Sequence, residues 1–268
     1  MNNRNRLRGI AFIGLLHVVL MSCDKGNKPK GDSLPIEQIG SVQSVAGFGK
    51  QEGNPEGIPF QLPKGLRFVS RDSYPFDPSI ERLFGNMNTF YADINIVSDP
   101  TWDGGHVEFP AGLIMLNISP SGIQNGMLMG RVCINVPPNI HDTEGDTTTV
   151  YLGVACMNAT RGFPWEDNFA DDTKNYVIGK GKYRPSVVTT EPEVLKFISL
   201  LNDRPGLKLV QHQNPWDAFD EDYVEPEWMK PYNAIQLAFW KMTDGGGLSA
   251  PDLNELLTTL DQYSPKQY

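Results

Sequence analysis

The 268-residue sequence predicts an α+β fold in which an N-terminal β-sandwich-like module is followed by a helical portion. Between residues 58 and 154, short apolar runs are separated by Gly, Pro, Asn and Asp, which is typical of strands joined by turns. After residue 190, apolar residues recur at helical spacing. We therefore expect one globular domain over residues 58–268, mostly β over residues 58–160 and mostly helical and loop over residues 161–268.

Five apolar runs are the predicted strands. In chain order they are Leu66–Ser70, Phe90–Val97, Gly112–Ile118, Met127–Val136 and Thr148–Cys156. The fourth run alternates in polarity, and Pro137 and Pro138 end it. Only a polar, acidic link of residues 139–146 separates the last two runs, so a hairpin is one way in which they could pair.

Three predicted helices follow, each with a recognisable start. Thr190–Glu193 has the pattern of a capping box with proline in the first turn, and it opens an amphipathic helix that reaches Leu201. Pro231 suits the first turn of a second helix, Tyr232–Thr243, which three glycines follow. Ser249–Asp252 caps a third helix, whose leucines recur on one face.

The N-terminus has the features of an export signal. Arg4, Arg6 and Arg8 precede the apolar stretch Ile10–Met21, which is too short to span a membrane as a stable helix. The stretch ends in Leu20–Cys23, whose sequence Leu-Met-Ser-Cys resembles the bacterial lipobox. This resemblance implies a lipoprotein signal peptide over residues 1–22; the alternative is an ordinary secretory signal with an incidental cysteine.

The same resemblance implies that Cys23 is acylated. Acyl chains on one cysteine hold a protein at a membrane without embedding its fold. Residues 23–57 are polar and contain Gly and Pro, so we expect a flexible tether between the lipid and the domain. We expect a lipid-anchored protein of the cell envelope, at the outer membrane or the cell surface.

The formal charge of the chain is −9, and removal of the signal with its three arginines changes it to −12. This acidic balance argues against nucleic acid as a partner. The zinc-binding His-Glu-x-x-His pattern, the Gly-x-Ser-x-Gly nucleophile elbow and the glycine-rich nucleotide-binding patterns are absent from the sequence. We therefore expect neither catalytic residues nor a metal or other cofactor, and we do not expect an enzyme.

One segment mixes aromatic residues with carboxylates. Its residues are Trp216, Asp217, Asp220, Tyr223 and Trp228. Aromatic rings stack on sugar rings and carboxylates accept hydrogen bonds from sugar hydroxyls, so these five residues are candidates for ligand binding. The alternative is a loop that its aromatic residues anchor to the core.

Two segments far apart in the sequence carry the most informative pattern. The predicted strand Thr148–Cys156 ends in a cysteine, and the predicted helix Tyr232–Thr243 contains Gln236. Ala238, Trp240, Thr243, Asp244 and Gly245 follow that glutamine. Together the two segments resemble the signature of the thioester domains of bacterial surface proteins. In that family, a strand-end cysteine lies near a helix with a Thr-Gln-x-Ala-Ile-Trp motif, commonly followed by Thr-Asp-Gly.

The resemblance implies an internal thioester between Cys156 and Gln236. Cys156 would supply the sulfur, Gln236 the acyl group, and Trp240 would shield the bond from water. A thioester is an activated acyl group that an amine attacks. The implied function is surface adhesion by single-use covalent attachment, with a host or neighbouring-cell protein or glycan as the partner.

The sequence departs from this pattern at two helix positions, where Ile235 and Phe239 replace threonine and isoleucine. Three alternatives therefore stay open. In one, Cys156 is a buried apolar residue and Gln236 only forms hydrogen bonds, within a non-covalent carbohydrate- or protein-binding lipoprotein. In another, the protein is a pilus-like or scaffold subunit. In the third, Cys133 and Cys156 form a disulfide, although a hairpin register would place them too far apart.

Overall fold

The computed structural model describes residues 37–70, 82–119, 122–162, 181–209, 211 and 220–267. These residues form ten strands and three α-helices, so an α+β fold is present, with a sheet-rich body. The strands are β1 (Gly57–Pro59), β2 (Leu66–Phe68), β3 (Leu83–Gly85), β4 (Phe90–Ser98), β5 (Gly105–Phe109), β6 (Leu113–Asn117), β7 (Gly126–Met127), β8 (Val132–Val136), β9 (Thr148–Cys156) and β10 (Tyr183–Thr189). The helices are α1 (Pro192–Leu201), α2 (Lys230–Thr243) and α3 (Ala250–Tyr263).

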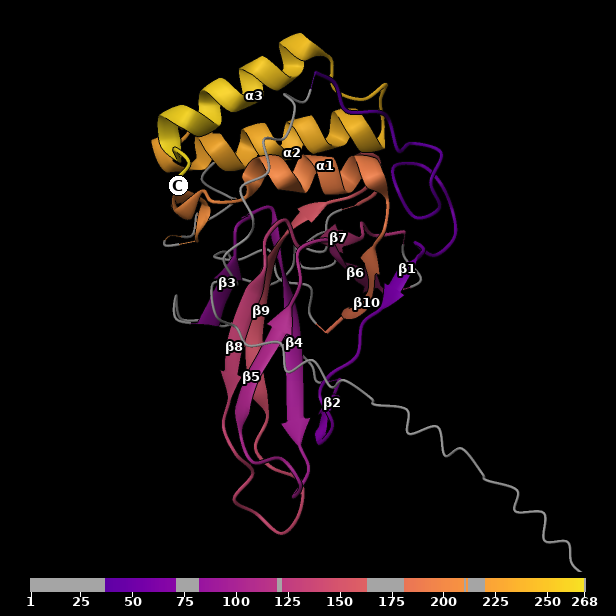
Figure 1. Ribbon diagram of the computed structural model, residues 1–268, viewed down its shortest axis with the longest axis vertical. Coiled ribbons are helices and arrows are strands. Elements are labelled where there is room, and N and C mark those ends of the chain that lie inside the picture. Colours follow the sequence, from indigo (N-terminus) through magenta and orange to yellow (C-terminus); the bar gives the residue numbers. More distant parts are fainter. Residues whose placement is uncertain are drawn as a thin grey trace, which may run out of the picture. The chain divides into compact units, whose positions relative to one another are not determined.

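The strands form one large sheet and one small sheet. The large sheet has the order β1-β10-β6-β7-β9-β4-β2, and β3 adds to it by pairing parallel with β9. The small sheet is the antiparallel pair β5-β8. Figure 1 shows the three helices gathered at one end of the long strands β4 and β9.

β9 lies between two hydrophobic clusters, because both of its faces are buried. The helix-side cluster contains Tyr151, Ala155 and residues of all three helices. The strand-side cluster contains Leu152 and Cys156, together with residues of β4, β5 and β8. Successive side chains of a strand point to opposite faces, so one strand contributes to both clusters. The end of β9 therefore lies where the helical layer meets the sheet.

The hairpin considered for the last two predicted strands does not form. β8 pairs with β5, whereas β9 pairs antiparallel with β4 from Thr148 to Val154 and with β7 at its end. The predicted strand Met127–Val136 is two strands, β7 and β8, separated near Gly130. Near Gly130 the chain passes from the large sheet to the small one. A side chain at this position would lie only 2.6 Å from Nδ2 of Asn86, so the passage is closely packed.

The expected tether ends too late in the sequence. Ile39, Val42 and Phe48 are buried in the helix-side cluster. The backbone N–H of Ile39 donates to the carbonyl of Leu248 at 3.0 Å, and the Leu248 N–H donates back at 2.8 Å. Residues 39–49 therefore belong to the folded domain, and the boundary predicted at residue 57 is wrong.

The three predicted helices and the cap at Ser249 are confirmed, but the capping box predicted at Thr190–Glu193 is wrong. Ser249 accepts from the N–H of Asp252 and forms a reciprocal capping box at the start of α3. At α1, the N-cap residue Glu191 makes no side-chain cap. Glu193 instead accepts from the N–H of Gly40 at 2.6 Å, so this carboxylate stabilises the N-terminal segment rather than the helix start.

Within the described residues, none of the helices combines the length and the apolar character that crossing a membrane requires.

Candidate functional site

β9 extends beyond the strand that pairs with it on one edge. β4 begins at Phe90, which lies opposite Val154, so Cys156 has no β4 residue to pair with. The N–H of Met157 donates to Asn125 on the β7 edge at 3.0 Å. In an antiparallel strand the N–H and C=O of one residue face one edge, and those of the next residue face the other edge. The N–H and C=O of Cys156 therefore face the β4 edge, at a point that β4 does not reach. Two buried backbone groups there need partners.

The side chain of Gln236 supplies both partners. Its Nε2 donates to the carbonyl oxygen of Cys156 at 2.9 Å, and its Oε1 accepts from the Cys156 N–H at 2.9 Å. The glutamine amide thus takes the place of a strand residue beside β9, although 80 residues separate it from Cys156 in the sequence. The two residues that the sequence singled out are therefore in direct contact.

Thr89 makes a third hydrogen bond to this amide. Its Oγ1 lies 2.8 Å from Oε1 of Gln236. The backbone partners fix which end of the amide is oxygen, because an N–H and a carbonyl contact opposite ends. Oε1 can only accept, so the Thr89 hydroxyl donates. Sequence reasoning missed Thr89, which stands alone just before β4; the only available signal was its position at the start of a predicted strand.

This contact is buried, and it holds a free thiol. Cys156 is fully buried and Gln236 is 5% exposed. Cys156 is a free cysteine, so the alternative of a Cys133–Cys156 disulfide is wrong. Burial raises the pKa of the Cys156 thiol well above its ordinary value, because a low-dielectric environment disfavours the thiolate. The sulfur is therefore a neutral thiol at physiological pH.

Trp240 lies one turn beyond Gln236 on α2. Its half-buried ring packs against the strand-side cluster, to which Cys156 also belongs. Its indole Nε1 is buried and has no acceptor among the described residues. The ring thus lies on the same side of β9 as the cysteine side chain.

The end of α2 is tied to the loop that follows Cys156. Asp244 accepts from the hydroxyl of Thr243 at 2.7 Å and from the N–H of Ala159 at 3.2 Å. Asn158 donates to the carbonyls of Gly47 and Gly49 at 3.0 and 2.8 Å. These bonds hold the end of α2, the N-terminal segment and the end of β9 together.

The acidic–aromatic segment is described only in part. Trp216 and Asp217 lie outside the described residues. Asp220 is exposed, and the N–H of Tyr223 donates to its carbonyl at 3.0 Å. Trp228 packs against the helix-side cluster and meets the ring of Tyr232 edge-on, with centroids 6.0 Å apart. This tryptophan therefore anchors its segment to the core.

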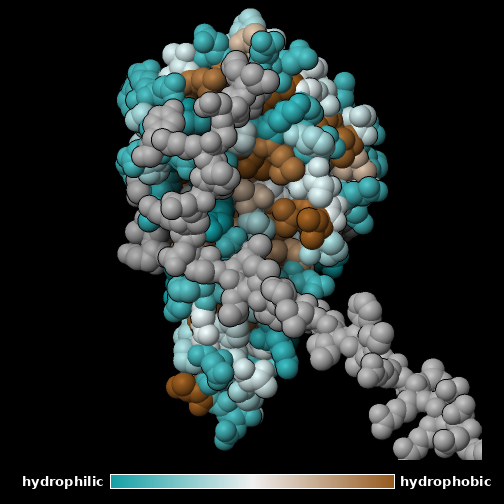
Figure 2. Space-filling model, viewed as in Figure 1, coloured by the Kyte–Doolittle hydropathy of each residue, from teal (hydrophilic) through white to brown (hydrophobic). Residues whose placement is uncertain are grey.

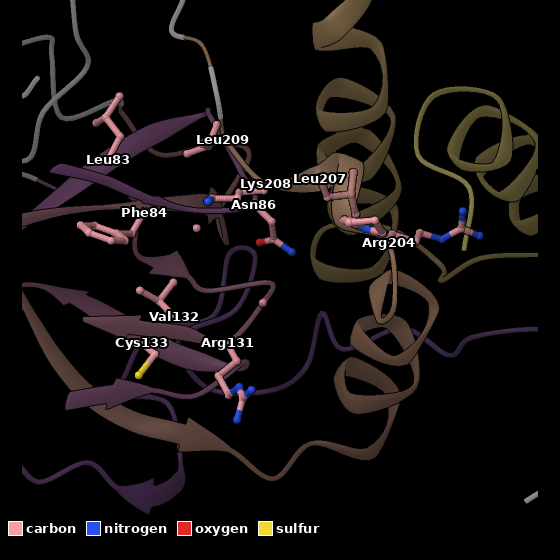
Figure 3. A pocket seen from close by; sticks show the side chains of 13 residues that line it. Leu83, Phe84, Asn86, Arg131, Val132, Cys133, Arg204, Leu207, Lys208 and Leu209 are labelled. Atoms are coloured by element: carbon pink, nitrogen blue, oxygen red, sulfur yellow. The ribbon is translucent and has the colours of Figure 1, made fainter. Parts of the chain in front are cut away.

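A pocket of about 650 Å³ lies beside β3. Its lining includes Leu83–Asn86, Gly130–Cys133, Arg204, Pro205 and Leu207–Leu209. Figure 3 shows Asn86 near the middle of the pocket, with the guanidinium of Arg204 turned away from it. Arg204 donates to the carbonyls of Leu200 and Ser264 and pairs with Asp261 at 2.8 Å, so its guanidinium stabilises the fold.

Among the residues that the structure describes, no three His, Cys, Asp or Glu side chains lie close enough to hold a metal ion. Cys23, the expected lipidation site, lies outside the described residues. Figure 2 shows polar residues over most of the described part of the visible surface, with apolar residues gathered near its middle.

Comparison with known proteins gives no relative. No family model, no curated protein and no solved structure matches this chain. Any functional assignment therefore depends on the residues of the site.

Proposed function

We propose that this protein is a surface-anchored adhesion lipoprotein that attaches covalently to amines through an internal Cys156–Gln236 thioester. The observation that carries the proposal is the buried pair of hydrogen bonds between the Gln236 amide and the backbone of Cys156. Those bonds hold the amide of a glutamine against the residue whose sulfur would attack it.

The proposed chemistry has two steps. In the first, Sγ of Cys156 adds to Cδ of Gln236, the C–N bond breaks, and ammonia leaves with the thiol proton. In the second, a primary amine adds to the same carbon, the C–S bond breaks, and the thiol of Cys156 is restored. An amide then joins Gln236 to the partner. Each molecule reacts once, so the protein is not an enzyme.

Burial suits both steps. Holding two groups in a reactive geometry supplies effective concentrations of about 10⁵ M or more, which offsets the weak nucleophilicity of a neutral thiol. A site closed to solvent also limits hydrolysis of the finished bond. Cys156 is fully buried, and the half-buried ring of Trp240 packs against the same cluster.

The N-terminal sequence supports a proposal about the location. We propose that residues 1–22 are removed as a signal peptide and that acylated Cys23 anchors the protein in the cell envelope, at the outer membrane or the cell surface. Because the folded domain includes Ile39, the tether spans residues 24 to about 36 in this account. The sandwich-like character of the β portion is supported by the small β5-β8 sheet, whose residues share one cluster with β4 and β9.

The test is the intact mass of the purified protein before and after methylamine. A thioester lowers the mass by about 17 Da through loss of ammonia, and methylamine then adds about 31 Da. We expect Cys156→Ala and Gln236→Ala each to remove both changes. Leu237→Ala is the matched control, because its side chain is exposed on the same helix, next to Gln236.

Amine capture by either site variant would refute the thioester assignment. An unshifted mass in the native protein would favour a second candidate, reversible ligand binding. The pocket beside β3 supports that candidate, because its lining includes the cations Arg131 and Lys208 and no acidic residue. An anionic small molecule is the ligand class that such a lining favours.

A further inference from the structure

We infer that Thr89 is a catalytic residue of the thioester chemistry, and that its hydroxyl and the N–H of Cys156 form an oxyanion hole for Oε1 of Gln236. This inference rests on the proposed function. It adds a residue that lies 147 positions from Gln236 in the sequence and on a different element from either thioester residue.

Both donors already aim at the oxygen that becomes negative. The Thr89 hydroxyl lies 2.8 Å from Oε1 and the Cys156 N–H lies 2.9 Å from it. Oxyanion-hole donors act at about 2.7–3.1 Å from the charged oxygen. Oε1 stays bonded to Cδ while that carbon becomes tetrahedral, so the two donors remain within reach throughout.

The same oxygen carries the charge in both steps. When Sγ of Cys156 adds to Cδ, the C=O electron pair moves onto Oε1; it returns as the C–N bond breaks and ammonia leaves. When an amine adds to the thioester, the pair moves onto Oε1 again and returns as the C–S bond breaks. Thr89 therefore affects both formation of the thioester and capture of the amine.

The hydrogen bond made by Nε2 of the amide belongs to the leaving group. Nε2 of Gln236, which departs as ammonia, donates to the carbonyl of Cys156. The carbonyl oxygen and the amide nitrogen of the reacting group thus have separate partners. This division fits an acyl transfer, in which one atom gains charge and the other leaves.

The chain around Thr89 is held rigidly against β9. The carbonyl of Met87 lies so close to Gly153 that a side chain there would come within 2.0 Å of its oxygen. Met87 is fully buried, and Phe90 begins the pairing with Val154. Thr89 is fixed between these two points, so its hydroxyl is preorganised before any reaction begins.

The experiment measures methylamine capture by four proteins: native, Thr89→Val, Thr89→Ala and Thr89→Ser. Removal of one oxyanion-hole donor slows acyl transfer by about 100-fold. We expect Thr89→Val and Thr89→Ala to capture methylamine about 100-fold more slowly than the native protein, or to accumulate less thioester after synthesis. Thr89→Ser keeps the hydroxyl and should react within a few-fold of the native rate. Circular dichroism establishes that each variant is folded.

The outcomes separate this inference from the proposed function. If the native protein shows no loss of ammonia, the proposed function fails. If the native protein forms the thioester and both hydroxyl-free variants react at its rate, the function stands and Thr89 has no catalytic role. If Thr89→Ser is as slow as Thr89→Val, the methyl group and its packing matter, and the oxyanion assignment is wrong.

Discussion

The short stretch from β3 to β4 borders two regions of opposite character. Leu83–Asn86 line the open pocket, and Thr89 contacts the buried Gln236 amide. At the first region cationic side chains line a cavity, and the side-chain oxygen of Asn86 is buried without a partner among the described residues. At the second region solvent is excluded and both polar atoms of the Gln236 amide are paired.

The two environments suit different kinds of chemistry. A reversible ligand must enter and leave, which needs an open and partly hydrated cavity. An activated acyl group must be kept from water until its target arrives, which needs a closed site. The Cys156–Gln236 contact has the second character, so we place the covalent chemistry there and not at the pocket.

The largest effect is expected for Gly153→Ala, because Gly153 touches both regions. A side chain there would lie 2.0 Å from the carbonyl oxygen of Met87 and 2.7 Å from Cδ1 of Leu209, which lines the pocket. We expect a loss of at least about 3 kcal/mol in the free energy of unfolding, because the clash is with backbone, together with slower methylamine capture. Denaturant unfolding and intact mass are the measurements. Gly246→Ala is the control, since a side chain there meets nothing within 4 Å. Equal unfolding free energies and equal capture rates for the two variants would show that Gly153 is not closely packed against Met87 and Leu209.

A smaller effect, confined to one region, is expected for Arg204→Ala. Its guanidinium satisfies the carbonyls of Leu200 and Ser264, and its loss leaves those oxygens unpaired. We expect about 1–3 kcal/mol of destabilisation and unchanged methylamine capture. Thermal unfolding and intact mass measure the two properties. Lys208→Ala, an exposed residue of the same pocket, is the control for the stability change. Loss of amine capture in a folded Arg204→Ala protein would show that the two regions are coupled.

The smallest effect concerns the pH dependence of the thiol. Burial raises the pKa of Cys156 above its ordinary value of 9.0, so the folded state keeps the proton longer than the unfolded state. The stabilisation is present below the unfolded-state pKa and is lost as the pH rises through the folded-state pKa. In Gln236→Ala, which keeps the thiol, we expect the unfolding free energy to fall above about pH 9, by at most about 1.4 kcal/mol per pH unit. The double variant Gln236→Ala, Cys156→Ala should lack this slope. If the unfolding free energies of the two variants depended on pH in the same way, the thiol would not be shielded from solvent.

Long periodic segments were predictable from the sequence, and isolated residues were not. The bounds of β9 match the predicted strand, and α2 begins two residues before the predicted Tyr232. Both segments carry strong apolar patterns, which made the strand and the helix predictable, and the resemblance to the thioester-domain signature singled out Cys156 and Gln236 within them. Thr89 could not, because a single hydroxyl before a strand has no local signal; only the pairing of β4 with β9 brings it to Gln236.

The errors have physical reasons as well. Residues 39–49 were assigned to the tether because glycine and polar residues surround the few apolar ones, yet Ile39 and Phe48 find partners on distant helices. β10 was missed because Pro185 lies within it, and the register with β6 shifts just after that proline. A hairpin of the last two predicted strands does not form because closeness in the sequence does not decide strand pairing. β8 pairs instead with β5, which precedes it by more than 20 residues.

The position of the methylamine label tests the Cys156–Gln236 thioester at the level of single residues. After reaction, peptide fragmentation should place an increase of about 14 Da on Gln236, the mass of an N-methyl amide, and should find a free thiol at Cys156. A label on any other residue, or a native protein that takes up no label at all, would contradict the Cys156–Gln236 thioester.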